Sequence, residues 1–204
     1  MTSSFEIQNM KSILDKAASM QKRAWRLIEE TNIIPIWQEI GATINLVGSL
    51  KTGLLLNHRD IDFHIYTDPF TLQDSFKAIA RLAEDPHIKQ ITYTNLLEEQ
   101  DRCLEWHAIY QDGENEPWQI DMIHILPDSP FAGFFEKVAA RIEAVLTDET
   151  RNAILLIKDS LPHEKKVMGI QIYQAVIADG VRNHNEFNDW LERHSANEII
   201  TWMP

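Results

Sequence analysis

The chain has 204 residues, of which 44% are hydrophobic and 25% are charged, and this balance excludes an intrinsically disordered protein. Its formal net charge of −12 argues against a large nonspecific nucleic-acid surface, because binding to phosphate backbones draws on clustered Lys and Arg. A small substrate with positive charge would be attracted instead. We therefore expect a small-molecule partner and no extended nucleic acid.

The single cysteine, Cys103, excludes an intrachain disulfide and a cysteine-rich zinc site. Its sequence context favours a small buried side chain over a reactive thiol. The N-terminus lacks a basic start followed by an apolar run, and no apolar stretch approaches the length of a membrane span. We therefore expect a cytoplasmic protein without membrane contact.

Hydrophobic spacing predicts the first three elements of the chain. Apolar residues recur at helical spacing across residues 4–31, which predicts a long helix. Pro35 suits the first turn of a second, short helix that Gly41 ends. The apolar run from Ile44 to Val47 then predicts a strand.

A glycine-serine pair and two aspartates follow this strand. Gly48 and Ser49 come directly after it, and Asp60 and Asp62 follow a polar loop, with Ile61 between them. Side chains alternate along a strand, so Asp60 and Asp62 would project the same way, about 6.6 Å apart. A cation or hydrogen-bond donors would compensate such a pair, and Mg²⁺ suits it because it prefers hard oxygen ligands. Because Gly48 allows a close backbone approach, the stretch predicts a phosphate-binding turn beside a metal clamp.

The middle of the chain predicts a helix and more strands. The strand with the aspartate pair continues to Tyr66, and strands are expected at 88–96, 103–110 and around Asp121. An Asp-Gly turn at Gly113 predicts that the last two form an antiparallel hairpin. A helix is expected from 71 to 83. Its expected inner positions are Leu72, Phe76, Ile79, Ala80 and Leu82.

After Pro130 the strand signals disappear, and helices are expected instead. The helical segments fit residues 132–147, 149–160, 164–179 and 184–194.

The order of these residues resembles the signature of the nucleotidyltransferase superfamily that includes DNA polymerase beta. The resemblance rests on an apolar residue, Gly48-Ser49, a polar loop, and Asp60-Ile61-Asp62 between apolar neighbours. In that family a third carboxylate lies on a later neighbouring strand, and Asp121 is similar to it in type and in place. The resemblance implies an α+β fold, with a mixed β-sheet head packed against helices in residues 1–128. A helical subdomain in residues 129–204 would follow, as in antibiotic-modifying and other small-substrate members.

The activity that the resemblance implies is metal-dependent transfer of a nucleoside monophosphate from a nucleoside triphosphate such as ATP to an acceptor hydroxyl. Asp60, Asp62 and Asp121 would be the catalytic residues and would bind two Mg²⁺ ions, with Mn²⁺ as a substitute. Asp121 would also help to remove the acceptor's proton. The residues that would bind the nucleotide phosphates are Gly48, Ser49 and Lys51.

Several alternatives stay open at this point. A noncatalytic nucleotide- or partner-binding module could use the same fold, and so could a pyrophosphotransferase of the guanosine tetraphosphate synthetase kind. Arg59 could pair with one of the aspartates, and Lys165 and Lys166 could neutralise a triphosphate. The nearby histidines are expected in the core or in supporting roles; they are His58, His64 and His124. The acceptor, the nucleobase and the choice between monomer and homodimer are left undecided.

Overall fold

The computed structural model describes residues 4–111, 113, 116–162, 167–194 and 202–204. The chain forms two compact units, each assembled from separate segments. The sheet unit comprises Lys22–Lys51 and Arg59–Lys137. The helical unit comprises Met1–Gln21, Thr52–His58 and Val138–Pro204. The sequence suggested a boundary between two domains at residue 128. That boundary stays a prediction.

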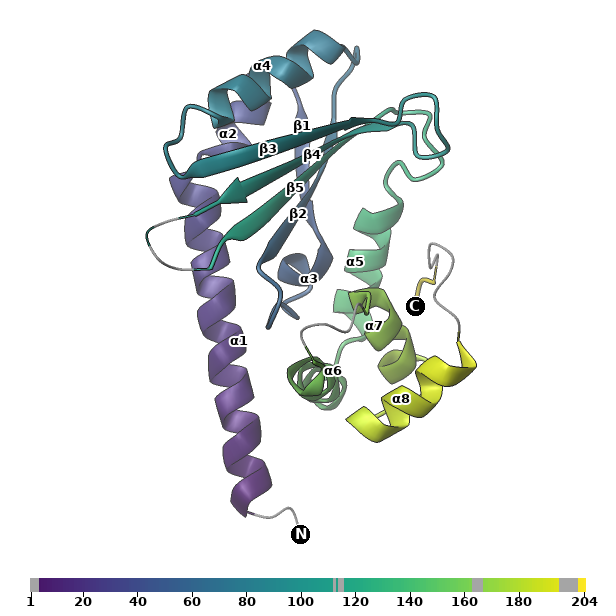
Figure 1. The fold of residues 1–204 in the computed structure, drawn as a ribbon. Helices are drawn as coiled ribbons and strands as arrows, with labels where there is room; N and C mark the ends of the chain where they lie inside the picture. The colour runs from purple at the N-terminus through teal and green to yellow at the C-terminus, as the bar shows by residue number, and fades with distance from the viewer. Residues whose placement is uncertain (1–3, 112, 114–115, 163–166, 195–201) are drawn as a thin grey trace. The chain divides into compact units, whose positions relative to one another are not determined.

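The sheet unit contains one five-stranded sheet in the order β1-β2-β5-β4-β3 (Figure 1). Neighbouring strands run antiparallel except β2 and β5, which are parallel. The sheet is therefore mixed, as expected, and the predicted hairpin is the β4–β5 pair. The strands are β1 (Thr43–Val47), β2 (Asp60–Tyr66), β3 (Ile88–Asn95), β4 (Cys103–Tyr110) and β5 (Trp118–Ile125).

The two faces of this sheet differ in polarity because side chains alternate along each strand. One face is apolar and buried, with Phe63, Trp106 and Met122 at 2% exposure or less. Helix α4 (Leu72–Leu82) lies on this face, since Trp106 Nε1 donates to Ser75 Oγ over 2.9 Å. The other face carries Asp62 and Asp121, so the sheet separates the core from the polar residues of the candidate site.

The buried side of α4 differs from the expected one. Ile79 and Leu82 are buried as predicted, but Leu72 and Phe76 are 43% and 44% exposed, and Ala80 is exposed too. Ser75 takes an inner position because its hydroxyl accepts the indole hydrogen of Trp106, which turns Phe76 towards the surface. There Phe76 packs edge-on against Trp106, with ring centroids 4.8 Å apart.

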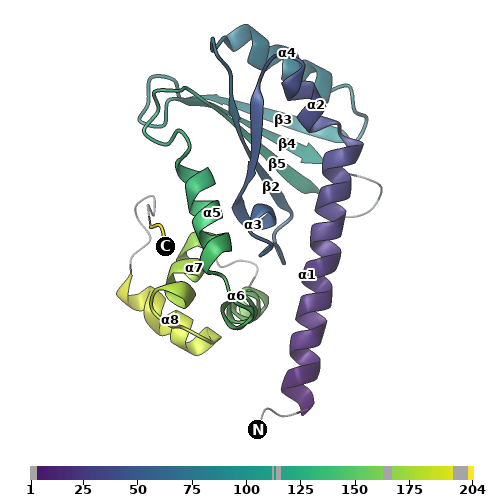
Figure 2. The ribbon, with the colours of Figure 1, turned by 180° about the vertical axis from the view of Figure 1, so that it is seen from behind.

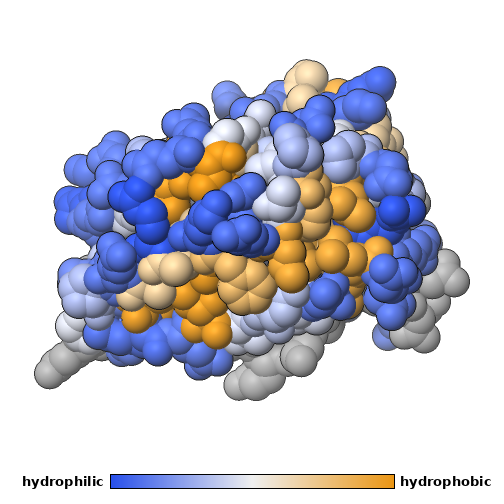
Figure 3. Space-filling model, turned by 90° about the horizontal axis from the view of Figure 1, so that it is seen from above, coloured by the Kyte–Doolittle hydropathy of each residue, from blue (hydrophilic) through white to orange (hydrophobic). Residues whose placement is uncertain are grey.

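Seen from above, apolar areas interrupt the hydrophilic surface (Figure 3). Among the described residues of the sheet unit, the large apolar side chains that are at least 36% exposed are Trp25, Leu72, Phe76 and Tyr93.

Two further helices belong to the first part of the chain. Helix α1 (Ser4–Glu30) matches the long helix predicted from hydrophobic spacing, and its residues contribute to both units. Helix α2 (Ile33–Gln38) starts two residues before Pro35. Figures 1 and 2 show α2 beside α4.

The helical unit contains α6 (Asp148–Ser160), α7 (Gly169–Ile177) and α8 (His184–Arg193), with most of α5 (Phe134–Val145). Ile13 and Ala17 of α1 pack with Leu56 and Leu155 in its core. All four predicted helical segments are present. The third begins at Gly169, and the start predicted at 164 falls outside the described residues.

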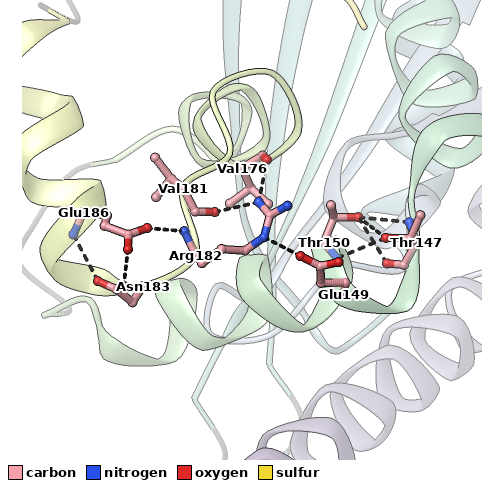
Figure 4. A network of polar contacts seen from close by, with 8 residues as sticks. All are labelled: Thr147, Glu149, Thr150, Val176, Val181, Arg182, Asn183 and Glu186. Atoms are coloured by element: carbon pink, nitrogen blue, oxygen red, sulfur yellow. Dashed lines mark hydrogen bonds and ion pairs between the residues drawn. The ribbon is translucent and has the colours of Figure 1, made fainter.

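Polar contacts join the ends of these helices (Figure 4). Thr147 and Thr150 form a reciprocal cap at the start of α6, which satisfies backbone N–H groups that have no helical partner. Arg182 Nε donates to Glu149 over 2.8 Å, and its Nη1 donates to the Val176 carbonyl over 3.0 Å. This arginine therefore ties the segment before α8 to α6 and α7.

Two of the simpler expectations can be compared with the structure. Cys103 is 2% exposed, and burial raises the pKa of its thiol to about 12, as expected for an unreactive core residue. Among the described residues, every helix is too short or too polar to cross a bilayer.

Candidate active site

Three aspartates lie on one face of the sheet. Asp60 and Asp62 are two residues apart on β2, and Asp121 lies directly beside Asp62 on the parallel strand β5. In-register neighbours on paired strands point to the same side and are about 4.8 Å apart along the hydrogen-bonding direction. Asp60 has Gln119 as its neighbour on β5. The fold therefore brings together carboxylates that are far apart in the sequence.

Gly48 meets Asp62 at the end of β1. Val47, the residue before Gly48, pairs with Asp62 across the β1–β2 ladder. A Cβ atom on Gly48 would lie 2.8 Å from Asp62 Cγ and would overlap its Oδ2 atom. Gly48 also has a φ of +67°, a backbone conformation that favours glycine. This position therefore requires glycine for two separate reasons.

The segment after Gly48 is a single helical turn, α3 (Gly48–Lys51), where the sequence suggested only a turn. Ser49 is half-buried in it and Lys51 is exposed. Both residues belong to the turn that begins at Gly48, where the backbone approaches Asp62.

The carboxylate of Asp60 has an atom that fits a cation. Its Oδ1 atom is buried and accepts no hydrogen bond within the described part of the chain. A buried carboxylate oxygen without a partner is costly, and a hard cation such as Mg²⁺ would satisfy it. The oxygen donors on this face are thus of the right kind for Mg²⁺.

The three carboxylates do not form a complete metal-binding site. Across the described ranges, no three Asp, Glu, His or Cys side chains converge closely enough to hold an ion. Asp121 accepts hydrogen bonds from neighbouring side chains instead. Gln119 Nε2 donates to both of its oxygens, over 2.8 and 3.1 Å.

His107 is the second partner of Asp121. Its Nδ1 atom lies 2.6 Å from Asp121 Oδ1, and its Nε2 atom lies 3.6 Å from Glu105 Oε2. Burial lowers the pKa of His107, but the hydrogen bond and charge of Asp121, with a smaller effect of Glu105, outweigh it and raise the pKa overall. Sequence reasoning missed His107. The sequence predicted the hairpin but not its register, in which His107 and Asp121 pair directly across β4 and β5.

The other charged candidates have different partners from those considered. Arg59 donates to the Glu116 carbonyl over 2.9 Å and pairs with the Glu116 carboxylate at 3.2 Å, so it is engaged outside the aspartate group. Lys165 and Lys166 lie outside the described residues.

Two of the nearby histidines, His64 and His124, are buried as expected, whereas His58 is not. His64 is 7% exposed and faces Glu136 at 3.4 Å. His124 is fully buried, with Nε2 2.9 Å from Thr67 Oγ1. His58 is exposed.

Comparison with known proteins gives matches at the level of structure. No protein family and no curated protein matches the sequence. The noncanonical poly(A) polymerase complex GLD-2–GLD-3 aligns with a TM-score of 0.59 and 10% identity over 95% of this chain and 66% of the other. The GLD-2/RNP-8 complex aligns with a TM-score of 0.53 and 10% identity over 94% and 74%. The Cid1 poly(U) polymerase with MgGTP bound gives 0.51 and 14% over 83% and 55%.

This chain has the nucleotidyltransferase fold. The α+β class expected from the sequence is confirmed, with a mixed sheet followed by helices. The chain spans just under two thirds of the matched chain in the first of these structures. At identities of 10% to 14%, the likeness supports the nucleotidyltransferase fold alone. The acceptor and the activity must therefore be argued from the residues.

Proposed function

We propose that this protein is a metal-dependent nucleotidyltransferase that moves a nucleoside monophosphate from a nucleoside triphosphate to an acceptor hydroxyl. The observation that carries the proposal is the in-register pairing of Asp62 with Asp121 on parallel strands. Two further features support it: the approach of Gly48 to Asp62, and the buried oxygen of Asp60 that has no hydrogen-bond partner among the described residues. The likeness in fold to polymerases that transfer nucleotides supports the same proposal.

In this mechanism each residue has a separate task. Asp60, Asp62 and Asp121 would hold Mg²⁺, which when bound stabilises negative charge on the attacking and leaving oxygens. The bare backbone at Gly48 would let phosphate oxygens approach, Ser49 would donate a hydrogen bond to them, and Lys51 would offset their charge.

The bonds that change are those at the α-phosphorus. The acceptor oxygen forms a bond to it, the bond to the β-phosphate bridging oxygen breaks, and pyrophosphate leaves with the electron pair. Asp121 would accept the proton of the acceptor hydroxyl, since it is the carboxylate on the strand beside the aspartate pair. For Asp121 to bind a cation, Gln119 would have to release it.

For the acceptor we favour a small molecule that carries positive charge. The net charge of −12 produces a field that attracts cations and repels polyanions. The second candidate is the 3′-hydroxyl of an RNA, which the fold likeness to the GLD-2 poly(A) polymerase favours.

The test is calorimetric titration with ATP and with GTP, with and without Mg²⁺, on the wild type and an Asp60→Ala, Asp62→Ala variant. We expect Mg²⁺-dependent nucleotide binding that the double variant loses. Asp85→Ala is the matched control, because Asp85 belongs to the same unit and pairs with His87. If the wild type binds no nucleotide under any condition, the proposal fails and a partner-binding module is favoured.

A second assay identifies the acceptor. Transfer of label from α-labelled nucleoside triphosphates would be followed into pools of aminoglycosides, lincosamides, sugars and a short oligoribonucleotide. Labelled aminoglycoside or lincosamide supports the small cationic acceptor, and an extended oligoribonucleotide supports the RNA candidate. Release of AMP with transfer of pyrophosphate would point instead to a pyrophosphotransferase.

A further inference from the structure

The contact between His107 and Asp121 is shorter than either hydrogen bond that Gln119 donates to the same carboxylate. His107 is in direct register with Asp121 across the antiparallel β4–β5 pair, where Cβ atoms are about 4.5–5.5 Å apart. The distance from its Nδ1 atom to Asp121 Oδ1 is 2.6 Å. Because the two strands fix both backbones, this contact exists before any ligand binds.

The surroundings of His107 do not call for a histidine on packing grounds. Its neighbours Trp106 and Ala108 point to the opposite, buried face and are 2% and 0% exposed. The His107 side chain itself is 30% exposed, against 18% for Asp121. Both of its ring nitrogens face carboxylates, Asp121 on one side and Glu105 on the other.

We propose that His107 is a positioning residue for the transfer reaction: its imidazole holds the Asp121 carboxylate in the orientation that cation binding and acceptor activation require. This inference rests on the proposed nucleotidyltransferase activity and adds a residue to it.

The Asp121 carboxylate has enough acceptor sites to accept a hydrogen bond from His107 and to bind a cation. An ionised carboxylate has about four acceptor sites on its two oxygens. His107 occupies one site on Oδ1, and within the described residues Oδ2 accepts only the longer hydrogen bond, 3.1 Å, from Gln119. Gln119 is exposed and can turn away, whereas His107 lies on β4, directly opposite Asp121 on β5. Release of Gln119 would therefore free Oδ2 while His107 keeps Oδ1 in place.

Residues that orient a metal ligand in this way have measurable effects. Their loss typically costs about 10- to 100-fold in metal affinity or activity, because the ligand then samples unproductive orientations. We expect the loss to fall on cation affinity and kcat, with the KM for the nucleotide changed less than about threefold, since His107 does not touch the phosphates in this scheme.

Three substitutions at residue 107 distinguish the loss of the hydrogen bond to Asp121 from a general loss of packing. In His107→Asn the amide nitrogen takes the place of Nδ1 and can still donate to Asp121. In His107→Gln it takes the place of Nε2 and reaches towards Glu105 instead. His107→Leu fills the volume without any donor. The matched control is His87→Leu, because His87 makes a similar contact to a carboxylate, 2.9 Å to Asp85. This pair does not include any of the three aspartates of the candidate site.

The main readout is Mn²⁺ affinity, measured by electron paramagnetic resonance in the presence of a nonhydrolysable ATP analogue, and it needs no turnover. We expect His107→Leu and His107→Gln to weaken Mn²⁺ binding by about tenfold or more, with His107→Asn close to wild type. His87→Leu should leave the affinity unchanged. Thermal unfolding of each variant checks that the fold persists.

Two contrary outcomes are distinguishable. If an Asp60→Asn, Asp62→Asn variant loses Mn²⁺ while His107→Leu retains it, the role of His107 is refuted and the proposed function stands. Equal weakening in all three residue-107 variants also refutes the positioning role, since the Nδ1 donor would then not matter. If the wild type binds no Mn²⁺, the proposed function and this inference both fail.

Discussion

Gly48 is the residue at the site that must lack a side chain. In Gly48→Ala the new methyl group would overlap the Asp62 carboxylate, and the φ of +67° would cost about 1–2 kcal/mol of folding free energy. We expect nucleotidyl transfer to fall more than about tenfold, because small displacements of a catalytic group are costly. Steady-state kinetics and urea unfolding measure the two effects.

The control for this substitution is Gly133→Ala. Gly133 has a φ of +70°, but a Cβ atom there would meet nothing within 4 Å. It should lose similar stability and keep its activity. Full activity in Gly48→Ala would contradict the close approach of the turn to Asp62.

His124 makes stability depend on pH. Burial lowers the pKa of His124 from 6.5 to about 4, only partly opposed by the charge of Asp74. Its Nδ1 atom is buried without a hydrogen-bond partner among the described residues, so a second ring proton would find no acceptor there. The folded protein therefore binds a proton on His124 less readily than the unfolded chain does.

Since the folded pKa is the lower one, this contribution to stability is complete above pH 6.5 and is lost as the pH falls towards 4. We expect about 3 kcal/mol of unfolding free energy to disappear over that interval. Urea unfolding at several pH values measures it, and His124→Gln, which keeps a donor for Thr67 but does not titrate, should show a flatter profile. Identical slopes in both proteins would contradict the assignment.

At the scale of elements, Glu136 joins the start of α5 to β2. Tyr66 donates to its Oε1 atom over 2.7 Å, His64 approaches Oε2 at 3.4 Å, and the Gly133 backbone N–H donates to the same tyrosine oxygen over 3.0 Å. Burial would raise the pKa of Glu136, but the hydrogen bonds from His64 and Tyr66 outweigh it and lower the pKa to about 2. The ionised carboxylate is therefore the form that holds the helix to the strand.

We expect Glu136→Gln to lower the unfolding free energy by about 1–3 kcal/mol at pH 7, because a half-buried group loses charge-assisted hydrogen bonds. A double-mutant cycle with Tyr66→Phe, measured by urea unfolding, should give a coupling of at least about 0.5 kcal/mol. Since the folded pKa lies below 4.5, the advantage of wild type over Glu136→Gln should shrink as the pH falls from 4.5 towards 2. Additive effects of the two substitutions would refute the link.

The elements were largely predictable because their signals are local. The helical spacing in α1 and the alternation in β4 and β5 appear in short windows, and the observed ends agree within a few residues. The pairing of His107 with Asp121 was not predictable in this way. A two-residue turn fixes the register of a hairpin, but a longer connection runs from Tyr110 to Trp118, and it leaves several registers open.

The error at α4 has a different cause. Leu72 and Phe76 suggested the buried side by their hydrophobicity, but the hydrogen bond between Ser75 and Trp106 turned the helix. Contacts between distant residues override a local pattern, and the sequence does not contain them explicitly.

At the scale of the whole molecule, the candidate site depends on a pairing between distant strands. β2 and β5 lie side by side, although α4 and two strands separate them in the chain. Periodicity cannot say which strands become neighbours. Asp121 was therefore found through the resemblance to a known family rather than through spacing, and the parallel register with Asp62 came only from the structure.

The net charge of −12 gives the last prediction, which concerns the acceptor. The field of an acidic protein speeds the encounter with a cationic acceptor and slows it with RNA, and salt screens both effects. Raising the ionic strength from about 0.05 M to about 0.5 M should lower kcat/KM for an aminoglycoside by about tenfold or more, since the screening length shortens from roughly 14 Å to roughly 4 Å. A neutral sugar acceptor is the control and should respond little, which separates screening of the acceptor from effects of salt on nucleotide or Mg²⁺ binding. A kcat/KM for an oligoribonucleotide that rises with salt would agree with the same field acting on a polyanion, whereas an aminoglycoside rate that does not change with salt would contradict electrostatic selection of the acceptor.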